Sequence, residues 1–105
     1  MRFLCKTHDI PLDEVRRIPV PRRAPIAVYR LEDGLYATED LCTHGAARLS
    51  DGLVENGQII CPLHHGSFDI RTGKPARLPC ASAVKTYKLV VEGDDVFLKV
   101  EALGR

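Results

Sequence analysis

Short apolar runs separated by turn residues dominate the chain, a pattern typical of small β-strands rather than helices. Three pairs of such runs flank the dipeptides Asp33-Gly34, Asn56-Gly57 and Gly93-Asp94, which favour tight turns. Each pair therefore predicts an antiparallel hairpin. The predicted hairpin strands are Ile26 to Leu31 with Leu35 to Thr38, Val54-Glu55 with Gln58 to Cys61, and Val84 to Glu92 with Val96 to Glu101.

Two further strands are expected near the start of the chain, at Phe3 to Thr7 and Val15 to Val20. The second is expected near a sheet edge, because Pro19 and two later prolines lack amide donors for a neighbouring strand. The segment His8 to Glu14 has room for a single helical turn, and no longer helix is predicted.

The length and composition predict one all-β domain over residues 1–105. A chain of 105 residues with 45% hydrophobic content can bury a real but small core. We expect a small antiparallel β-sandwich or barrel as the base. The segment from about Glu39 to Ser82 is expected to form a subdomain inserted between the strands of that base.

This expected insertion contains two pairs of possible metal ligands. Cys42 and His44 form the first pair, and Cys61 and His64 form the second after a gap of sixteen residues. A zinc site with two Cys and two His usually spaces each pair more widely, and its second pair is commonly two histidines on a helix. One thiolate and one imidazole in each loop instead favour a centre with two metal ions and two chemically different ends.

These residues carry a resemblance to a known family. The segments C-T-H-G at 42–45 and C-P-L-H-H-G at 61–66 resemble the motif of Rieske proteins. The order of strands and turns is similar to the small bacterial ferredoxins of aromatic-ring dioxygenase systems. The resemblance implies a [2Fe–2S] cluster, with Cys42 and Cys61 on one iron and His44 and His64 on the other.

The same resemblance implies a one-electron carrier without catalytic residues of its own. A flavin-containing reductase would reduce it. A terminal Rieske oxygenase would take the electron from it and hydroxylate an aromatic ring. The remaining residues show no nucleotide motif and no 2-His-1-carboxylate site. We expect Pro79 to shield the cluster sulfurs and a small, apolar docking face to surround the histidines. Its expected members are Gly45, Ala46, Leu63, His65 and Pro79.

The sequence favours a cytoplasmic, monomeric protein. It shows no apolar run of signal-peptide length at its start and no stretch long enough to span a membrane. Cys5 and Cys80 remain after the four ligands are assigned. Packed, reduced thiols are favoured, and a disulfide between the two is the alternative. His8 lacks partners at ligand spacing and is expected at the surface.

Four arginines form a basic cluster that does not favour nucleic-acid binding, because the net charge is only +1 and no aromatic residues interleave with them. A solvated face is expected, with steering of an acidic partner as the alternative. The cluster consists of Arg16, Arg17, Arg22 and Arg23.

Three alternative functions stay open at this stage. The chain would then be the small Rieske subunit of a nitrite reductase, a redox sensor, or a zinc-bound structural module. The partner genes would separate the first, and the iron and sulfide content would separate the last.

The reduction potential is expected toward the bottom of the Rieske range of roughly −150 to +300 mV. Rieske proteins of respiratory complexes have a disulfide at the positions of Ala47 and Leu63, and hydroxyl donors to cluster sulfur at those of Gly66 and Phe68. Losing donors destabilises the more negative, reduced cluster. Protein-film voltammetry tests this, and a midpoint well above zero contradicts it. A hydrogen bond from Ser67 to the cluster would weaken the argument.

Overall fold

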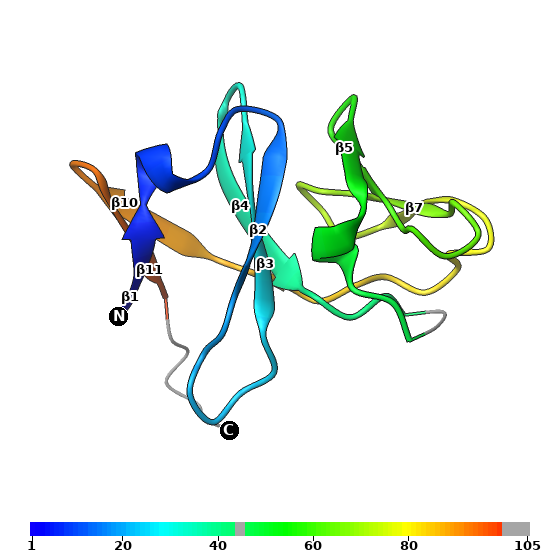
Figure 1. Cartoon of the computed structure of the whole chain (residues 1–105), viewed down its shortest axis with the longest axis horizontal. Coiled ribbons are helices and arrows are strands. Elements are labelled where there is room, and N and C mark those ends of the chain that lie inside the picture. The colour runs from blue at the N-terminus through cyan, green and yellow to red at the C-terminus, as the bar shows by residue number, and fades with distance from the viewer. Residues whose placement is uncertain (44–45, 100–105) are drawn as a thin grey trace.

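The computed structural model describes residues 1–43 and 46–99, and within these ranges antiparallel strands form three sheets and no α-helix occurs (Figure 1). The first sheet has the order β1 (Arg2–Lys6), β11 (Asp95–Leu98), β10 (Leu89–Glu92). The second has the order β2 (Glu14–Ile18), β3 (Ile26–Leu31), β4 (Gly34–Glu39), β9 (Thr86–Tyr87). The third has the order β5 (Leu53–Glu55), β6 (Gln58–Ile60), β7 (Ser67–Asp69), β8 (Pro75–Arg77).

Strand β3 is the centre of the fold because both of its faces are buried. Its sequence is a nearly continuous apolar run, which is typical of a strand covered on both sides. Ala27, Tyr29 and Leu31 belong to one hydrophobic core, whereas Ile26 and Val28 belong to the other. The second sheet is therefore covered by the first sheet on one face and by the third sheet on the other.

The buried hydroxyl of Tyr29 is paired within the second sheet. It lies 2.8 Å from Oγ1 of Thr38, and the Thr38 hydroxyl donates to the carbonyl of Glu39. Burial raises the pKa of Tyr29 well above its usual range, so the phenol stays neutral. A polar group inside this core thus costs little, because a hydrogen bond replaces its water.

The three predicted hairpin turns are confirmed. In the third sheet, Asn56 and Gly57 have φ angles of 50° and 75°, so both central residues of this turn are left-handed, as a type I′ turn requires. The turn joins β5 to β6, with Glu55 opposite Gln58. The edge position predicted from Pro19 is also confirmed, because β2 is an outer strand of the second sheet.

One predicted strand is wrong. The segment Val84 to Glu92 is not continuous but divides at Lys88: β9 pairs with β4, and β10 pairs with β11 in another sheet. The Lys88 carbonyl still accepts a hydrogen bond from the Lys99 amide at 3.0 Å. An alternating sequence pattern does not reveal that a chain crosses from one sheet to the next, because both halves keep the same period. The end of the predicted strand to Glu101 lies outside the described residues.

Other short elements differ from the sequence prediction. The helical turn is a 3-10 turn at Thr7–Asp9, which starts before the expected range. A second 3-10 turn at Leu49–Asp51 and the strands β7 and β8 were not predicted. Three-residue elements are too short to produce a recognisable period. Strand β8 begins with Pro75 and is an edge strand, where a missing amide donor is tolerated.

The third sheet is the inserted part of the fold. It follows β4 and precedes β9 in the chain, and it occupies the right-hand end of the molecule in Figure 1. Leu49 and Phe68 pack from this insertion into the core that contains Tyr29. Arg71 also donates two hydrogen bonds to Asp33 in the β3–β4 turn, at 3.1 and 2.9 Å. The expected all-β base with an inserted subdomain is thereby confirmed.

Within the described residues, no helix is both long enough and apolar enough to cross a lipid bilayer.

Candidate metal centre

The first expected ligand loop runs from Leu41 to Arg48 and is closed at its base. Leu41 and Arg48 form an isolated antiparallel bridge, and the Cys42 amide donates to the Ala47 carbonyl at 2.9 Å. The Cys42 side chain is buried in the core. His44 lies, with its neighbour Gly45, outside the described residues.

Asp40 anchors this loop, and sequence reasoning missed it. Its carboxylate accepts hydrogen bonds from the Ser50 amide at 2.7 Å and the Ser50 hydroxyl at 2.9 Å. It also lies 3.3 Å from Nε of Arg17, and its own side chain is almost fully buried. An acidic residue before a loop looks like any surface turn, so no local signal in the sequence indicated this role.

The second expected ligand loop separates a buried thiol from an exposed imidazole. The Cys61 amide donates to the Gly66 carbonyl at 2.7 Å, which closes the loop, and the Cys61 side chain is fully buried. His64 and His65 are exposed and have φ angles of 68° and 60°. Two successive non-glycine residues in the left-handed region are strained, and such strain is concentrated at functional sites.

A third loop, containing Pro79 and Cys80, packs against the second. A Cβ atom on Gly66 would lie 2.7 Å from Sγ of Cys80 and 3.0 Å from Cδ of Pro79. The Thr43 hydroxyl donates to the Ser82 carbonyl at 2.8 Å, so the third loop is also tied to the first. Glycine is thus required at position 66 by close approach of the chain. The absence of a side chain there is a packing constraint.

Three buried thiols meet where these loops converge. Sγ of Cys42 lies 4.0 Å from Sγ of Cys80, and Cys61 shares a hydrogen bond with Cys42. Burial, with a smaller contribution from that hydrogen bond, raises the pKa of Cys61 to about 11. Burial, followed by the charge of Cys42, raises the pKa of Cys80 to about 12. Metal binding by Cys61 must therefore displace its proton.

The donor chemistry fits an iron–sulfur centre. Both expected thiolate ligands come together in an apolar core, and soft sulfur ligands favour such centres. The described residues by themselves contain no group of three or more His, Cys, Asp or Glu side chains arranged around a single metal position. His44, the fourth expected ligand, is not among them.

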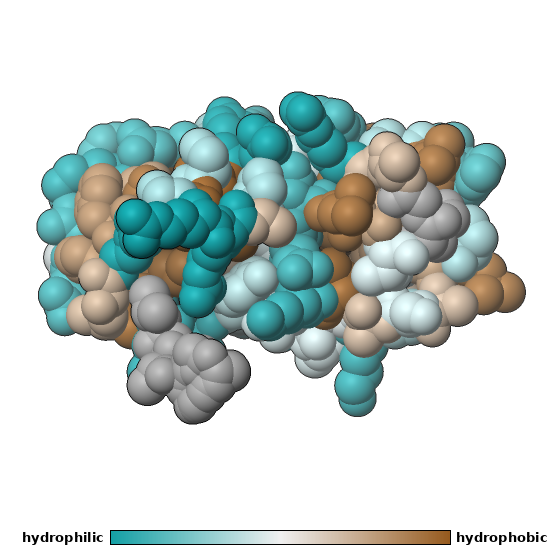
Figure 2. All heavy atoms as spheres, turned by 90° about the horizontal axis from the view of Figure 1, so that it is seen from below, coloured by the Kyte–Doolittle hydropathy of each residue, from teal (hydrophilic) through white to brown (hydrophobic). Residues whose placement is uncertain are grey.

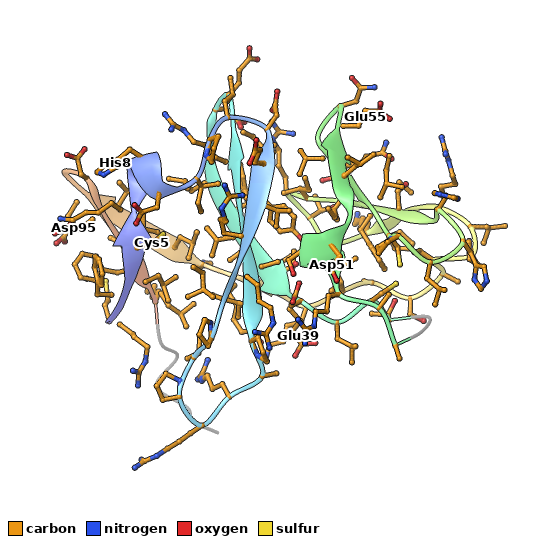
Figure 3. The ribbon with its side chains drawn as sticks, viewed as in Figure 1. Cys5, His8, Glu39, Asp51, Glu55 and Asp95 are labelled. Carbon is orange, nitrogen blue, oxygen red and sulfur yellow. The ribbon has the colours of Figure 1, made fainter. Side chains whose placement is uncertain are left out.

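The two remaining cysteines are far apart in the fold. Cys5 lies in β1 at the opposite end of the molecule from the third sheet (Figure 3) and belongs to the other hydrophobic core. All four cysteines are buried and none takes part in a disulfide. The prediction of packed thiols is confirmed for Cys5 and Cys80.

The Ser67 hydroxyl does not point its hydrogen at the centre. Ser67 is buried and donates to Oε1 of Gln58 at 2.7 Å, and a hydroxyl has only one hydrogen to give. Phe68 is fully buried in the core. The Ser67 hydroxyl is therefore not available as a donor that would raise the reduction potential.

Apolar side chains are exposed around the converging loops. Figure 2 shows them at the right-hand end of the molecule, which the third sheet and its loops form. Among the expected docking residues, Ala46, Leu63, His65 and Pro79 are exposed, and Gly45 lies outside the described residues. Leu41 and Leu78 are 60% and 76% exposed beside the first and third loops, and sequence reasoning missed both.

The basic cluster has partners of its own. Arg17 pairs with Asp40, and Arg16 pairs with Glu14 at 3.0 Å. The exposed Arg22 has a φ angle of 65° in the turn before β3. This agrees with the solvated face expected from the sequence.

Residues 1–88 match the family model of the Rieske [2Fe-2S] domain, and the chain belongs to this family. The ferredoxin component of the naphthalene 1,2-dioxygenase/salicylate 5-hydroxylase systems of Ralstonia sp. is 47% identical over 89% of this chain and 88% of its own length. Ferredoxin CarAc of Metapseudomonas resinovorans is 40% identical over 93% of this chain and 92% of its own.

Solved structures agree. The ferredoxin in a complex of reduced oxygenase and oxidized ferredoxin of carbazole 1,9a-dioxygenase superposes with a TM-score of 0.87 at 39% identity, covering 94% of this chain and 95% of that one. The Sphingomonas yanoikuyae B1 ferredoxin superposes with a TM-score of 0.90 at 34% identity, covering 94% and 97%.

The comparisons decide between the functions left open by the sequence. The cofactor is a [2Fe–2S] cluster, which excludes the zinc module. The chain is an electron-transfer ferredoxin of the dioxygenase type and not itself an enzyme. A chain assigned to a nitrite reductase small subunit shares only 24% identity, a level that shows the common fold alone.

Replacing Gly66 with serine is expected to destabilise the protein. The added side chain would collide with Cys80 and Pro79, and overpacking of this kind costs about 1–3 kcal/mol in free energy of unfolding. Denaturant unfolding of the cluster-loaded protein measures the loss. Ala81→Ser is the matched control, since it adds a hydroxyl at an exposed position of the third loop. Equal stability of Gly66→Ser and the control would show that the loops are not in close contact.

Proposed function

We propose that the protein carries single electrons from a flavin-containing reductase to the terminal Rieske oxygenase of an aromatic-ring dioxygenase system. The observation that carries this proposal is that the expected thiolate ligands are buried and an expected imidazole ligand is exposed. Cys42 and Cys61 meet in the core, while His64 lies at the surface in the same loop as Cys61. A relative with 39% identity is found in a complex with its oxygenase, which supports the direction of transfer.

The cluster would be bound asymmetrically, by Cys42 and Cys61 on the inner iron and by His44 and His64 on the outer iron. When bound, it supplies a centre that accepts and releases one electron. The thiolates are anionic and the imidazoles neutral, so the histidine side is the easier one to reduce. The strained backbone at His64 holds an imidazole at the surface, where an electron has the shortest path to a partner.

The docking face would surround the exposed histidines. It comprises the five residues expected from the sequence, together with two exposed leucines. Apart from His65, these residues are small or apolar, so a partner can approach closely without displacing strongly bound water, and a limited area keeps the complex transient. The proposed face consists of Gly45, Ala46, Leu63, His65 and Pro79, extended by Leu41 and Leu78.

We further infer that the chain acts as one domain and as a monomer in the cytoplasm, with residues 39–82 as its cluster-binding subdomain. A carrier that alternates between two partners must present the same face to each in turn. Self-association through that face would block both encounters.

The paired variants His64→Asn and His65→Asn test the ligand assignment. Asparagine tolerates the left-handed backbone of both positions, so the two changes are matched in their local strain. We expect His64→Asn to lose the visible absorption and the electron paramagnetic resonance signal of the reduced cluster. His65→Asn is expected to keep both, together with two irons and two acid-labile sulfides per chain, and to slow electron transfer to the oxygenase.

The measurements are iron and sulfide analysis and the spectrum of the dithionite-reduced protein. Full absorption in His64→Asn would remove His64 from the ligand set. Loss of the cluster in His65→Asn would instead assign the ligand role to His65.

A further inference from the structure

The converging loops bring together one thiol more than the proposed ligand set uses. Cys80 is buried and its Sγ atom lies 4.0 Å from that of Cys42, within the distance of a hydrogen bond between sulfur atoms. Sulfur contacts of this length are weak but directional, and a thiol has one hydrogen to donate. If Cys42 binds iron, as the ligand assignment proposed above requires, the direction of this hydrogen bond is fixed.

Cys42 binds iron as a thiolate and then carries no hydrogen. Of the two sulfur atoms, only Cys80 retains one. We propose that the Cys80 thiol donates a hydrogen bond to the ligand sulfur of Cys42 and thereby raises the reduction potential of the cluster. A donor to a ligand sulfur withdraws negative charge from it and stabilises the reduced state more than the oxidised state.

The position of Cys80 is built into the fold. The Cys80 amide donates to the Arg77 carbonyl at 3.2 Å, and the third loop is held to the first by Thr43 and Ser82. Sγ of Cys80 also lies 2.7 Å from the point where a Cβ on Gly66 would be. The thiol thus takes the space that a serine at position 66 would need, and a thiol is a weaker donor than a hydroxyl.

Three variants test the effect on the midpoint potential, measured by protein-film voltammetry. Cys80→Ala is expected to shift the potential to more negative values. Cys80→Ser keeps a donor and is expected to lie above Cys80→Ala. Cys5→Ala is the matched control, since Cys5 is also a buried cysteine but lies in the other core, and it is expected to leave the potential unchanged.

The sign of the shift in midpoint potential distinguishes loss of a hydrogen-bond donor from increased access of water to the cluster. Truncation to alanine that merely admitted water would raise the potential, because solvent favours the more negative reduced cluster. A potential of Cys80→Ala equal to or above that of the wild type therefore overturns the proposal.

A second measurement does not depend on the folding of a Cys80 variant. In the cluster-loaded Cys5→Ala protein, Cys80 carries the one remaining S–H group, because the other two cysteines bind iron. Its infrared stretching band is expected at lower wavenumber than that of a thiol without an acceptor, as a hydrogen bond weakens the S–H bond. An unshifted band, or no band, overturns the proposal.

The reduced electron paramagnetic resonance spectrum of each sample keeps this test apart from that of the ligand assignment. A normal Rieske spectrum with an unshifted S–H band refutes the role of Cys80 alone. The spectrum of His64→Asn tests only the ligand assignment and gives no information on Cys80.

Discussion

The structure depends on two cysteine side chains from separate loops meeting inside a hydrophobic core. A backbone hydrogen bond closes each expected ligand loop, from Cys42 to Ala47 in the first and from Cys61 to Gly66 in the second. Bonds from these thiolates to a metal exist only when the loops are folded together, so cluster binding and loop folding stabilise each other. The buried Cys61 thiol, whose pKa is raised by burial, holds its proton until metal replaces it.

The platform for this arrangement is the central sheet. Strand β3 directs Ala27, Tyr29 and Leu31 toward the core that contains the two expected cysteine ligands, and Ile26 and Val28 toward the core beneath the first sheet. The base therefore supports the metal centre with one face while it closes its own core with the other. A rigid base matters for an electron carrier, because small changes in ligand geometry and solvation alter the potential.

Three residues after the second expected cysteine ligand bear on the expected potential. Ser67 gives its hydrogen to Gln58, Phe68 packs in the core, and Gly66 has no room for a side chain. None of these three residues offers a strong side-chain donor to a cluster sulfur, which agrees with the low potential expected from the sequence. The exposed side chain of His64 and the apolar residues near it would be accessible in the proposed docking face.

Much of the proposed site could be inferred from the sequence because its expected ligands follow a short linear spacing. Cys42, Cys61 and His64 stand in tight loops next to hairpin strands, and turn pairs such as Asn56-Gly57 require backbone angles that few other residues adopt. Turn conformations and ligand spacing of this kind depend only on residues that are close together in the sequence. The all-β class and the inserted position of the site followed from it.

Other features were decided only by the tertiary structure. The contact between Cys42 and Cys80 joins residues 38 positions apart, and the clamp of Asp40 on Ser50 and Arg17 joins three separate segments. The division of a predicted strand at Lys88 likewise depends on which sheet each half reaches. Such contacts depend on the paths of whole loops over a shared core, and no local period or spacing along the chain records those paths.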